Sequence, residues 1–202
     1  MLAARWCLVP YATVRRVALS KDDWTEAALL ALTRDGLAGI AVEPLVRQLG
    51  TTKGSFYWHF ADRAELIAAT AELWEHRGTT ETIARIEAID GPRERLIELA
   101  AGAFEGAAAG NAYATVLTAA SDPRVRTVLE RFTRTWLTFL ERLYDDLGVA
   151  PREAALRARV AYAVYLGIGA LHRADPGGDP TGPELDTFLE LAVDSIVPPE
   201  RR

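Results

Sequence analysis

The chain has 202 residues, half of them hydrophobic, and a net charge of −5. A chain of this length and composition can bury a large core, which excludes disorder of the whole chain. Cys7 is the single cysteine, so a disulfide framework and a cysteine-based zinc site are excluded and a reducing, cytoplasmic location is expected. The acidic balance also excludes a surface coated in basic residues, so any contact with nucleic acid must be local.

The acid excess lies in the second part of the chain. Residues 1–77 carry nine basic and nine acidic residues, whereas residues 78–202 carry fourteen and nineteen. The first segment, residues 1–18, has no apolar run long enough for a membrane span and lacks the ordered regions of a signal peptide. We expect an unstructured extension there. Its three arginines, with no acid among them, leave a DNA-contacting arm open as an alternative.

The elements in chain order are all helical. No segment alternates in the way that strands do, while Ala, Leu, Arg and Glu recur at helical spacing, which predicts an all-α fold of about nine helices. The first helix should begin at the cap Ser20, with Asp23 three residues later and Leu19 packing on Trp24. Gly36 should end it.

Two short helices follow, over residues 42–49 and 53–59, with a tight turn at Gly50 and Thr52 as the cap of the second one. Asp62 caps a fourth helix. Beyond Gly78, turn-forming residues mark the breaks that separate five further helices, at 90–92, 109–111, 122–123, 148–151 and 175–183.

The segment 42–60 is the most informative one, because two helices so short must pack together against a third. Its packing side chains are Leu45, Val46, Leu49, Phe56 and Phe60. Its exposed side chains on the second helix are Thr52, Lys53, Ser55, Tyr57, Trp58 and His59. Such groups bind phosphates and base edges, so this helix could lie in the major groove of DNA. An aromatic-rich core hairpin is the alternative, but two adjacent exposed aromatic residues favour a partner.

The same segment resembles the tetracycline-repressor (TetR) family of bacterial regulators. The family has a first helix that ends in Gly, a helix-turn-helix, and a run of the type found here as KGSFYWHF, residues 53–60, before a capped fourth helix with a basic residue. Gly36, Asp62 and Arg63 stand at the corresponding positions. The resemblance covers about residues 20–70, and the rest of the chain matches only in helix number and length.

The resemblance implies a set of DNA-binding residues. These are Arg47, Thr52, Lys53, Gly54, Ser55, Tyr57, Trp58, His59 and Arg63. By position, the start of the second short helix approaches bases and backbone, Tyr57 and His59 contact phosphates, and Arg63 reaches the DNA backbone. The chain departs from the family at the start of the first short helix, where Ala41, Glu43 and Pro44 replace a hydroxyl residue and basic residues. Glu43 would repel a nearby phosphate.

The resemblance also divides the chain into a DNA-binding domain, residues 19–64, and a ligand-binding and dimerisation domain, residues 65–202. The expected ligand-binding residues are Phe104, Tyr113, Leu117, Trp136, Phe139, Leu140, Tyr162 and Tyr165, large side chains that could line an apolar pocket. The expected dimer-interface residues are Val160, Val164, Gly167, Leu171, Leu185, Phe188, Leu189 and Ala192. Ordinary core packing is the alternative for both sets.

The resulting prediction is a bacterial, cytoplasmic homodimer that represses transcription by binding a palindromic operator in double-stranded DNA. A partly apolar small-molecule effector would release it by favouring a dimer whose recognition helices no longer match half-sites about 34 Å apart. We expect no membrane partner, cofactor, metal or catalytic residue. The alternatives are a helical protein-interaction adaptor without DNA binding, or an all-α enzyme. An enzyme is disfavoured because the sequence has no phosphate-binding glycine loop, HExxH motif or nucleophile elbow.

Overall fold

The computed structural model describes the backbone of residues 19–108, 112–175 and 177–199, and their side chains except those of residues 103–108 and 112. The expected extension, residues 1–18, lies outside the described residues. Within those ranges all regular structure is helical, which confirms the all-α prediction. The α-helices are α1 (Lys21–Asp35), α2 (Val42–Gln48), α3 (Lys53–His59), α4 (Arg63–His76), α5 (Thr82–Glu87), α6 (Pro92–Ala108), α7 (Ala112–Thr118), α8 (Pro123–Asp146), α9 (Pro151–Ala174) and α10 (Pro183–Ile196).

A π-helical turn, Arg77–Glu81, joins α4 to α5 without a break in the chain's helical path. We call this continuous element, residues 63–87, the α4–α5 rod. Counted as one helix, it gives nine helices over the described residues, as predicted. Gly78 lies inside the rod, so it is not a break between helices.

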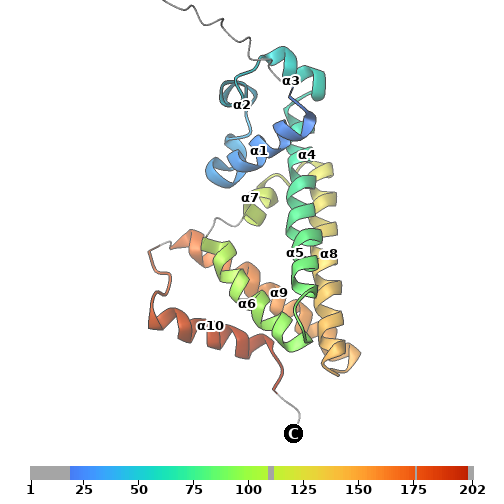
Figure 1. Cartoon of the computed structure of the whole chain (residues 1–202), viewed down its shortest axis with the longest axis vertical. Helices are drawn as coiled ribbons and strands as arrows, with labels where there is room; N and C mark the ends of the chain where they lie inside the picture. The colour runs from blue at the N-terminus through green and yellow to red at the C-terminus, as the bar shows by residue number, and fades with distance from the viewer. Residues whose placement is uncertain (1–18, 109–111, 176, 200–202) are drawn as a thin grey trace, which may run out of the picture.

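The first three helices form the expected three-helix unit (Figure 1). The Ser20 side chain accepts a hydrogen bond from the amide of Asp23, and the Asp23 carboxylate accepts one from the amide of Ser20, so the predicted capping box is present. Gly36 ends α1 with a φ of 68°, a conformation that favours glycine. These local signals set where α1 begins and ends, and Figure 1 shows the helix-turn-helix at one end of the molecule.

The remaining helices form the larger part of the molecule, which we call the bundle. Figure 1 shows the α4–α5 rod beside α8, with α6, α9 and α10 grouped at the end away from the helix-turn-helix. α9 packs against α8 and α6, while α10 packs against α6 and α9. The rod therefore runs from the helix-turn-helix into the bundle, and it contacts both.

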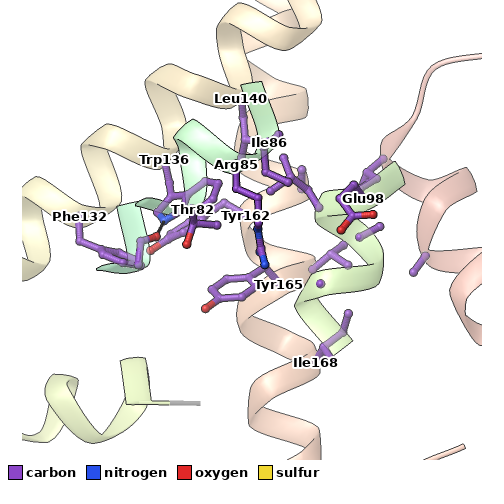
Figure 2. A pocket seen from close by; sticks show the side chains of 18 of the residues that line it. Thr82, Arg85, Ile86, Glu98, Phe132, Trp136, Leu140, Tyr162, Tyr165 and Ile168 are labelled. Carbon is purple, nitrogen blue, oxygen red and sulfur yellow. Dashed lines mark hydrogen bonds between the residues drawn. The ribbon is translucent and has the colours of Figure 1, made fainter. Parts of the chain in front are cut away.

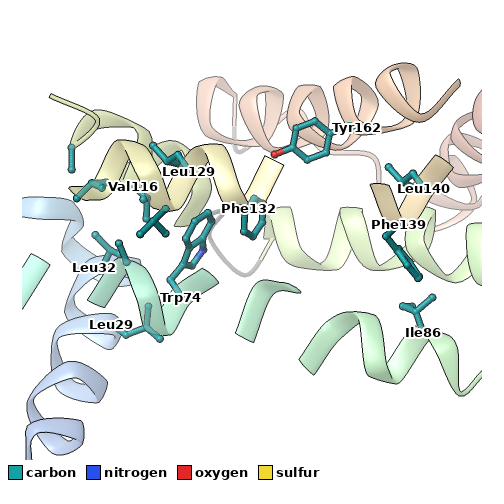
Figure 3. Packing of buried hydrophobic residues seen from close by; sticks show 14 of the residues in the cluster. Leu29, Leu32, Trp74, Ile86, Val116, Leu129, Phe132, Phe139, Leu140 and Tyr162 are labelled. Carbon is teal, nitrogen blue, oxygen red and sulfur yellow. The ribbon is translucent and has the colours of Figure 1, made fainter. Parts of the chain in front are cut away.

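One hydrophobic core extends through both parts of the molecule. Trp24 on α1 packs edge-on against Phe56 of α3, with ring centroids 5.4 Å apart. Farther along, Trp74 on the rod stacks on Phe132 of α8 at 4.3 Å. Figure 3 shows Trp74 in the cluster that also holds Leu32 of α1. Because a shared core transmits displacements, a change in the bundle can reach the helix-turn-helix.

Candidate nucleic-acid interface and internal cavity

Helix α3 presents its aromatic residues outward because of how it begins and packs. The Thr52 side chain caps it by accepting a hydrogen bond from the Ser55 amide at 3.3 Å. Phe56 faces inward and is fully buried. The side chains of Tyr57 and Trp58 are therefore turned outward, with 61% and 86% of their surfaces exposed. Exposed aromatic residues of this size indicate a contact surface.

The other predicted DNA-binding residues lie around this surface. Thr52, Lys53 and Gly54 are exposed at the start of α3, and Ser55 behind them is half-buried. Arg47 is exposed on α2. The structure thus brings these residues to one end of the molecule. Ser55 and His59 are half-buried there, although the sequence predicted that both would be exposed.

Lys53 is already paired inside the helix-turn-helix. Its Nζ lies 2.5 Å from Oε1 of Glu43 on α2. The hydrogen bond to Lys53 lowers the pKa of the Glu43 carboxyl, and the same bond raises the pKa of the Lys53 ammonium. Both side chains are exposed, so DNA phosphates would compete with Glu43 for the lysine. The sequence showed that Glu43 departs from the residues usual at this position of the family, but it did not show that Lys53 is its partner.

Two predicted phosphate contacts have partners within the protein. His59 Nε2 lies 2.8 Å from the carbonyl oxygen of Leu19, which accepts a hydrogen bond from the ring N–H. Arg63 donates from Nε to the carbonyl of Ile40 and from Nη2 to that of Leu37, both at 2.5 Å. The Arg63 bonds tie the start of the rod to the segment between α1 and α2. These contacts were missed because they join residues distant in sequence.

A cavity of about 270 Å³ lies within the bundle. Its wall comes from the rod and from α6, α8, α9 and α10. It is lined by Trp74, Gly78, Thr82, Arg85, Ile86, Glu98, Leu99, Ala100, Gly102, Phe132, Trp136, Leu140, Ala161, Tyr162, Val164, Tyr165, Ile168, Ala192 and Ile196. Figure 2 shows most of these side chains. The wall is predominantly apolar and aromatic, as is usual for a small-molecule site.

Four of the eight predicted ligand-binding residues line this cavity: Trp136, Leu140, Tyr162 and Tyr165. Three do not, since Tyr113 packs behind it against Tyr162, Leu117 is half-exposed on α7, and Phe139 is buried against Trp136. The side chain of Phe104 lies outside the described residues.

Sequence reasoning missed the contribution of the rod to the cavity. Trp74, Gly78, Thr82 and Arg85 follow one another at spacings of three or four residues, so they share one side of the rod, and all of them line the cavity. Their helical spacing could have identified them. It was not recognised because the sequence did not predict that the helix continues across Gly78.

An apolar face of α9 remains uncovered in the single chain. Leu156, Val160 and Leu171 are 61%, 52% and 66% exposed, and the half-buried Gly167 lies between the last two. By length and composition α9 could also cross a membrane, with 33% of its most apolar window buried. We call Leu156, Val160, Gly167 and Leu171 the α9 stripe.

The other predicted dimer residues lie off this stripe. Val164 and Ala192 line the cavity. Leu185, Phe188 and Leu189 are half-buried on α10. Phe188 packs against the core around Ile168.

The first part of the chain matches the model of a known protein family. The model of the bacterial regulatory proteins of the tetR family matches residues 25–70. A search of curated proteins found no sequence match. Over residues 25–70, the match confirms the predicted TetR resemblance.

Solved structures share the fold of the whole chain. A transcriptional regulator from Rhodococcus sp. Rha1 is 20% identical, with 88% of this chain and 96% of that chain covered and a TM-score of 0.71. A TetR-family regulator from Agrobacterium tumefaciens is 14% identical, with 88% and 97% covered and a TM-score of 0.71. The regulator FadR from Bacillus subtilis, solved in complex with stearoyl-CoA, is 14% identical, with 88% and 98% covered and a TM-score of 0.65.

The family match covers the helix-turn-helix, and the structural matches extend over the bundle that holds the cavity. Residues 25–70 thus match the tetR-family model, and the chain has the fold of solved transcriptional regulators, one of them of the TetR family.

Proposed function

We propose that this chain is a transcriptional repressor that binds a palindromic DNA operator as a homodimer and leaves it when a small molecule occupies the cavity. The exposed aromatic pair on α3, Tyr57 and Trp58, carries the DNA-binding part of the proposal, because it lies within the family match beside the exposed Thr52 and Lys53. A helix with such groups supplies contacts to phosphates and base edges.

Dimerisation is supported by the α9 stripe. Its side chains are apolar, and small residues along the same face, such as Ala163 and Gly167, would allow a second helix to approach closely. A membrane is the other possible occupant, but Arg152 and Arg159 lie on the same exposed face. A second copy of α9 and α10, forming a four-helix contact, fits this mixed face better.

Coupling between the cavity and DNA is supported by the rod. Trp74 and Arg85 line the cavity, while Arg63 at the other end of the rod bonds to the carbonyls of Leu37 and Ile40. A ligand that displaces the rod would therefore move the helix-turn-helix. The change in DNA-binding free energy that the ligand can cause is limited to the difference between its binding free energies for the two conformations.

The assignment extends to domain roles and location. We assign DNA binding to residues 19–64 and ligand binding and dimerisation to residues 65–202, a boundary inside the first turn of α4. We assign the protein to the cytoplasm and give it no catalytic role.

Selection from random-sequence duplex DNA tests the proposal. The purified chain should enrich inverted repeats, and its affinity for them should fall steeply with rising salt, because bound phosphates release counterions. Enrichment of no sequence, with the protein folded, would contradict DNA binding. An adaptor that binds only proteins would also lack the salt-dependent DNA affinity.

A further inference from the structure

The polar groups of the cavity indicate what kind of molecule it holds, given the proposed function on which this inference rests. Thr82, Arg85 and Glu98 are polar, and the tyrosines Tyr162 and Tyr165 add hydroxyl groups to an otherwise apolar wall. A few placed polar groups in such a wall select the orientation and chemistry of the ligand.

Arg85 is the cation of this wall. It lies on α5, and Figure 2 shows its side chain directed toward α9, where Tyr165 lies. Among the described residues it has no ion-pair or hydrogen-bond partner. Two arginines of α8 are paired with the rod, Arg142 with Glu87 at 3.0 Å and Arg131 with Glu75 at 3.0 Å. Arg85 is also exposed, so its donors are hydrated in the absence of a ligand and are free to bind one.

The hydroxyl of Tyr165 adds a second donor. The hydroxyl of Tyr162 is already 3.3 Å from that of Thr133, whereas that of Tyr165 has no partner among the described residues. Burial raises the pKa of Tyr165, so its hydroxyl stays protonated and can donate to an anion. A guanidinium and a phenol are together suited to a carboxylate.

Glu98, on α6, limits the charge of the ligand. Its carboxylate lines the same cavity and has no ion-pair partner among the described residues. A ligand with one negative charge can pair with Arg85, but a second negative charge would be repelled by Glu98.

We infer that the effector is a small monocarboxylate with an apolar, aromatic-compatible body, whose carboxylate is bound by Arg85 and Tyr165. Its body would lie against Trp74, Phe132 and Trp136. The cavity volume of about 270 Å³ is just below the range of about 300–1,000 Å³ for small-molecule sites, so the buried part of the effector is compact.

Calorimetric titration of the full chain with phenylbutyrate, phenylbutanol and phenylbutylamine tests this inference. The three probes share one body and differ in the charge of one end. Phenylbutyrate should bind about tenfold or more tightly than either of the others, because only its carboxylate can form an ion pair with the Arg85 guanidinium. Equal binding of all three, tighter binding of the amine, or binding of none would overturn the inference.

Three variants assign the contact. Arg85→Gln should remove the preference for phenylbutyrate and leave phenylbutanol binding unchanged, and Tyr165→Phe should weaken phenylbutyrate binding in a chain whose core keeps its shape. Arg134→Gln, an exposed arginine outside this cavity, is the matched control and should change nothing. A preference that survives both Arg85→Gln and Tyr165→Phe would refute the assigned contact.

Glu98 is tested with a dianion. Phenylsuccinate should bind the wild type weakly, and Glu98→Gln should strengthen that binding about tenfold. An unchanged affinity would remove Glu98 from the proposal.

Gel shifts with a selected operator separate this inference from the proposed function. Phenylbutyrate that binds through Arg85 but leaves operator affinity unchanged would support the ligand chemistry and contradict ligand-responsive repression. Release of DNA by a compound that binds independently of Arg85 would support ligand-responsive repression and contradict the proposed ligand chemistry.

Discussion

At the scale of single residues, the surface proposed to bind DNA has very few positive charges. Lys53 is bound by Glu43, and Arg63 by two backbone carbonyls. Since non-specific DNA affinity comes from neutralised phosphates, it should be weak. Specific affinity must depend on a few contacts of α3, repeated in the second subunit.

Substitution of Lys53 should therefore have a large effect. Lys53→Ala removes the cation at the start of α3 and leaves Glu43 unpaired near the phosphates, so operator affinity should fall roughly 10- to 100-fold. Gel shifts with a selected operator measure this loss. Arg134→Ala, on α8, serves as the control, and an unchanged affinity in Lys53→Ala would exclude Lys53 from the interface.

Substitution of Glu43 should act in the opposite direction. Glu43→Gln releases Lys53 and removes a charge that repels phosphate, so operator affinity should rise roughly twofold to tenfold. The plot of log affinity against log salt should also steepen by about 0.9 for each added phosphate contact. Weaker binding in this variant would show instead that Glu43 positions Lys53 for DNA.

At this scale the sequence predicted the exposure of Tyr57 and Trp58 correctly, that of Ser55 and His59 wrongly, and the hydrogen-bond partners not at all. Because Phe56 and Phe60 are core residues on one side of the helix, the helical spacing places Tyr57 and Trp58 on the outward side. The acceptors of the Arg63 bonds belong to the segment between α1 and α2. Their position depends on tertiary packing, which no local pattern encodes.

At the scale of elements, the π-helical turn of the rod packs directly against α8. A Cβ added to Gly78 would lie 2.9 Å from Cε2 of Phe132, and Trp136 Nε1 donates to the Gly78 carbonyl at 3.0 Å. Phe132 is itself stacked on Trp74. Gly78 is therefore a point of close approach between two helices, whereas the sequence alone showed only a residue that disfavours helix.

Gly78→Ala should destabilise the protein despite the higher helix propensity of alanine. The methyl group must displace a buried ring, at a cost of about 1–3 kcal/mol, and the gain in propensity is about 1 kcal/mol. We therefore expect the free energy of unfolding in urea to fall by up to about 2 kcal/mol. The matched control is Gly102→Ala on α6, where a Cβ meets nothing within 4 Å, so stability there should stay constant or rise.

A second element contact fixes the end of α10. The buried hydroxyl of Tyr144 on α8 donates to the carbonyl of Ile196 at 2.7 Å, and burial raises the Tyr144 pKa to about 12. Above about pH 10 an unfolded tyrosine loses its proton before the folded one does, so the unfolded state binds fewer protons. The free energy of unfolding should therefore fall as pH rises between about 10 and 12.

Tyr144→Phe isolates this effect. Loss of the hydrogen bond should lower the free energy of unfolding by about 1–2 kcal/mol near neutral pH, because the Ile196 carbonyl loses its partner. The difference in stability between wild type and variant should shrink above about pH 10. A constant difference across that range, measured by urea titration, would contradict the role of the hydroxyl.

At the scale of the whole molecule, the order of the helices could be predicted from the sequence, but not which helix faces would come together around the cavity. Caps such as Ser20 and Thr52 and the turn at Gly36 mark helix ends locally, and the structure has them where they were expected. The cavity arises where the rod, α6 and α9 meet, and the side chain of Arg85 points into it only because of that arrangement. Which residues line the cavity therefore depends on tertiary packing and cannot be predicted from composition.

The α9 stripe should control assembly and, through it, DNA binding. Leu171 is 66% exposed in the single chain, so Leu171→Glu should leave the monomer folded. In a dimer it would place two charges in an apolar contact, where an unpaired carboxylate is strongly disfavoured.

Sedimentation should therefore show a monomer at concentrations where the wild type is a dimer, and circular dichroism should show unchanged helix content. Operator affinity should fall far more than any single α3 contact could explain, because each monomer reads only one half-site. Leu30→Glu, at a position on α1 that is 64% exposed, should leave the dimer intact. If Leu171→Glu remains dimeric, the interface lies elsewhere, and the apolar face of α9 needs another partner.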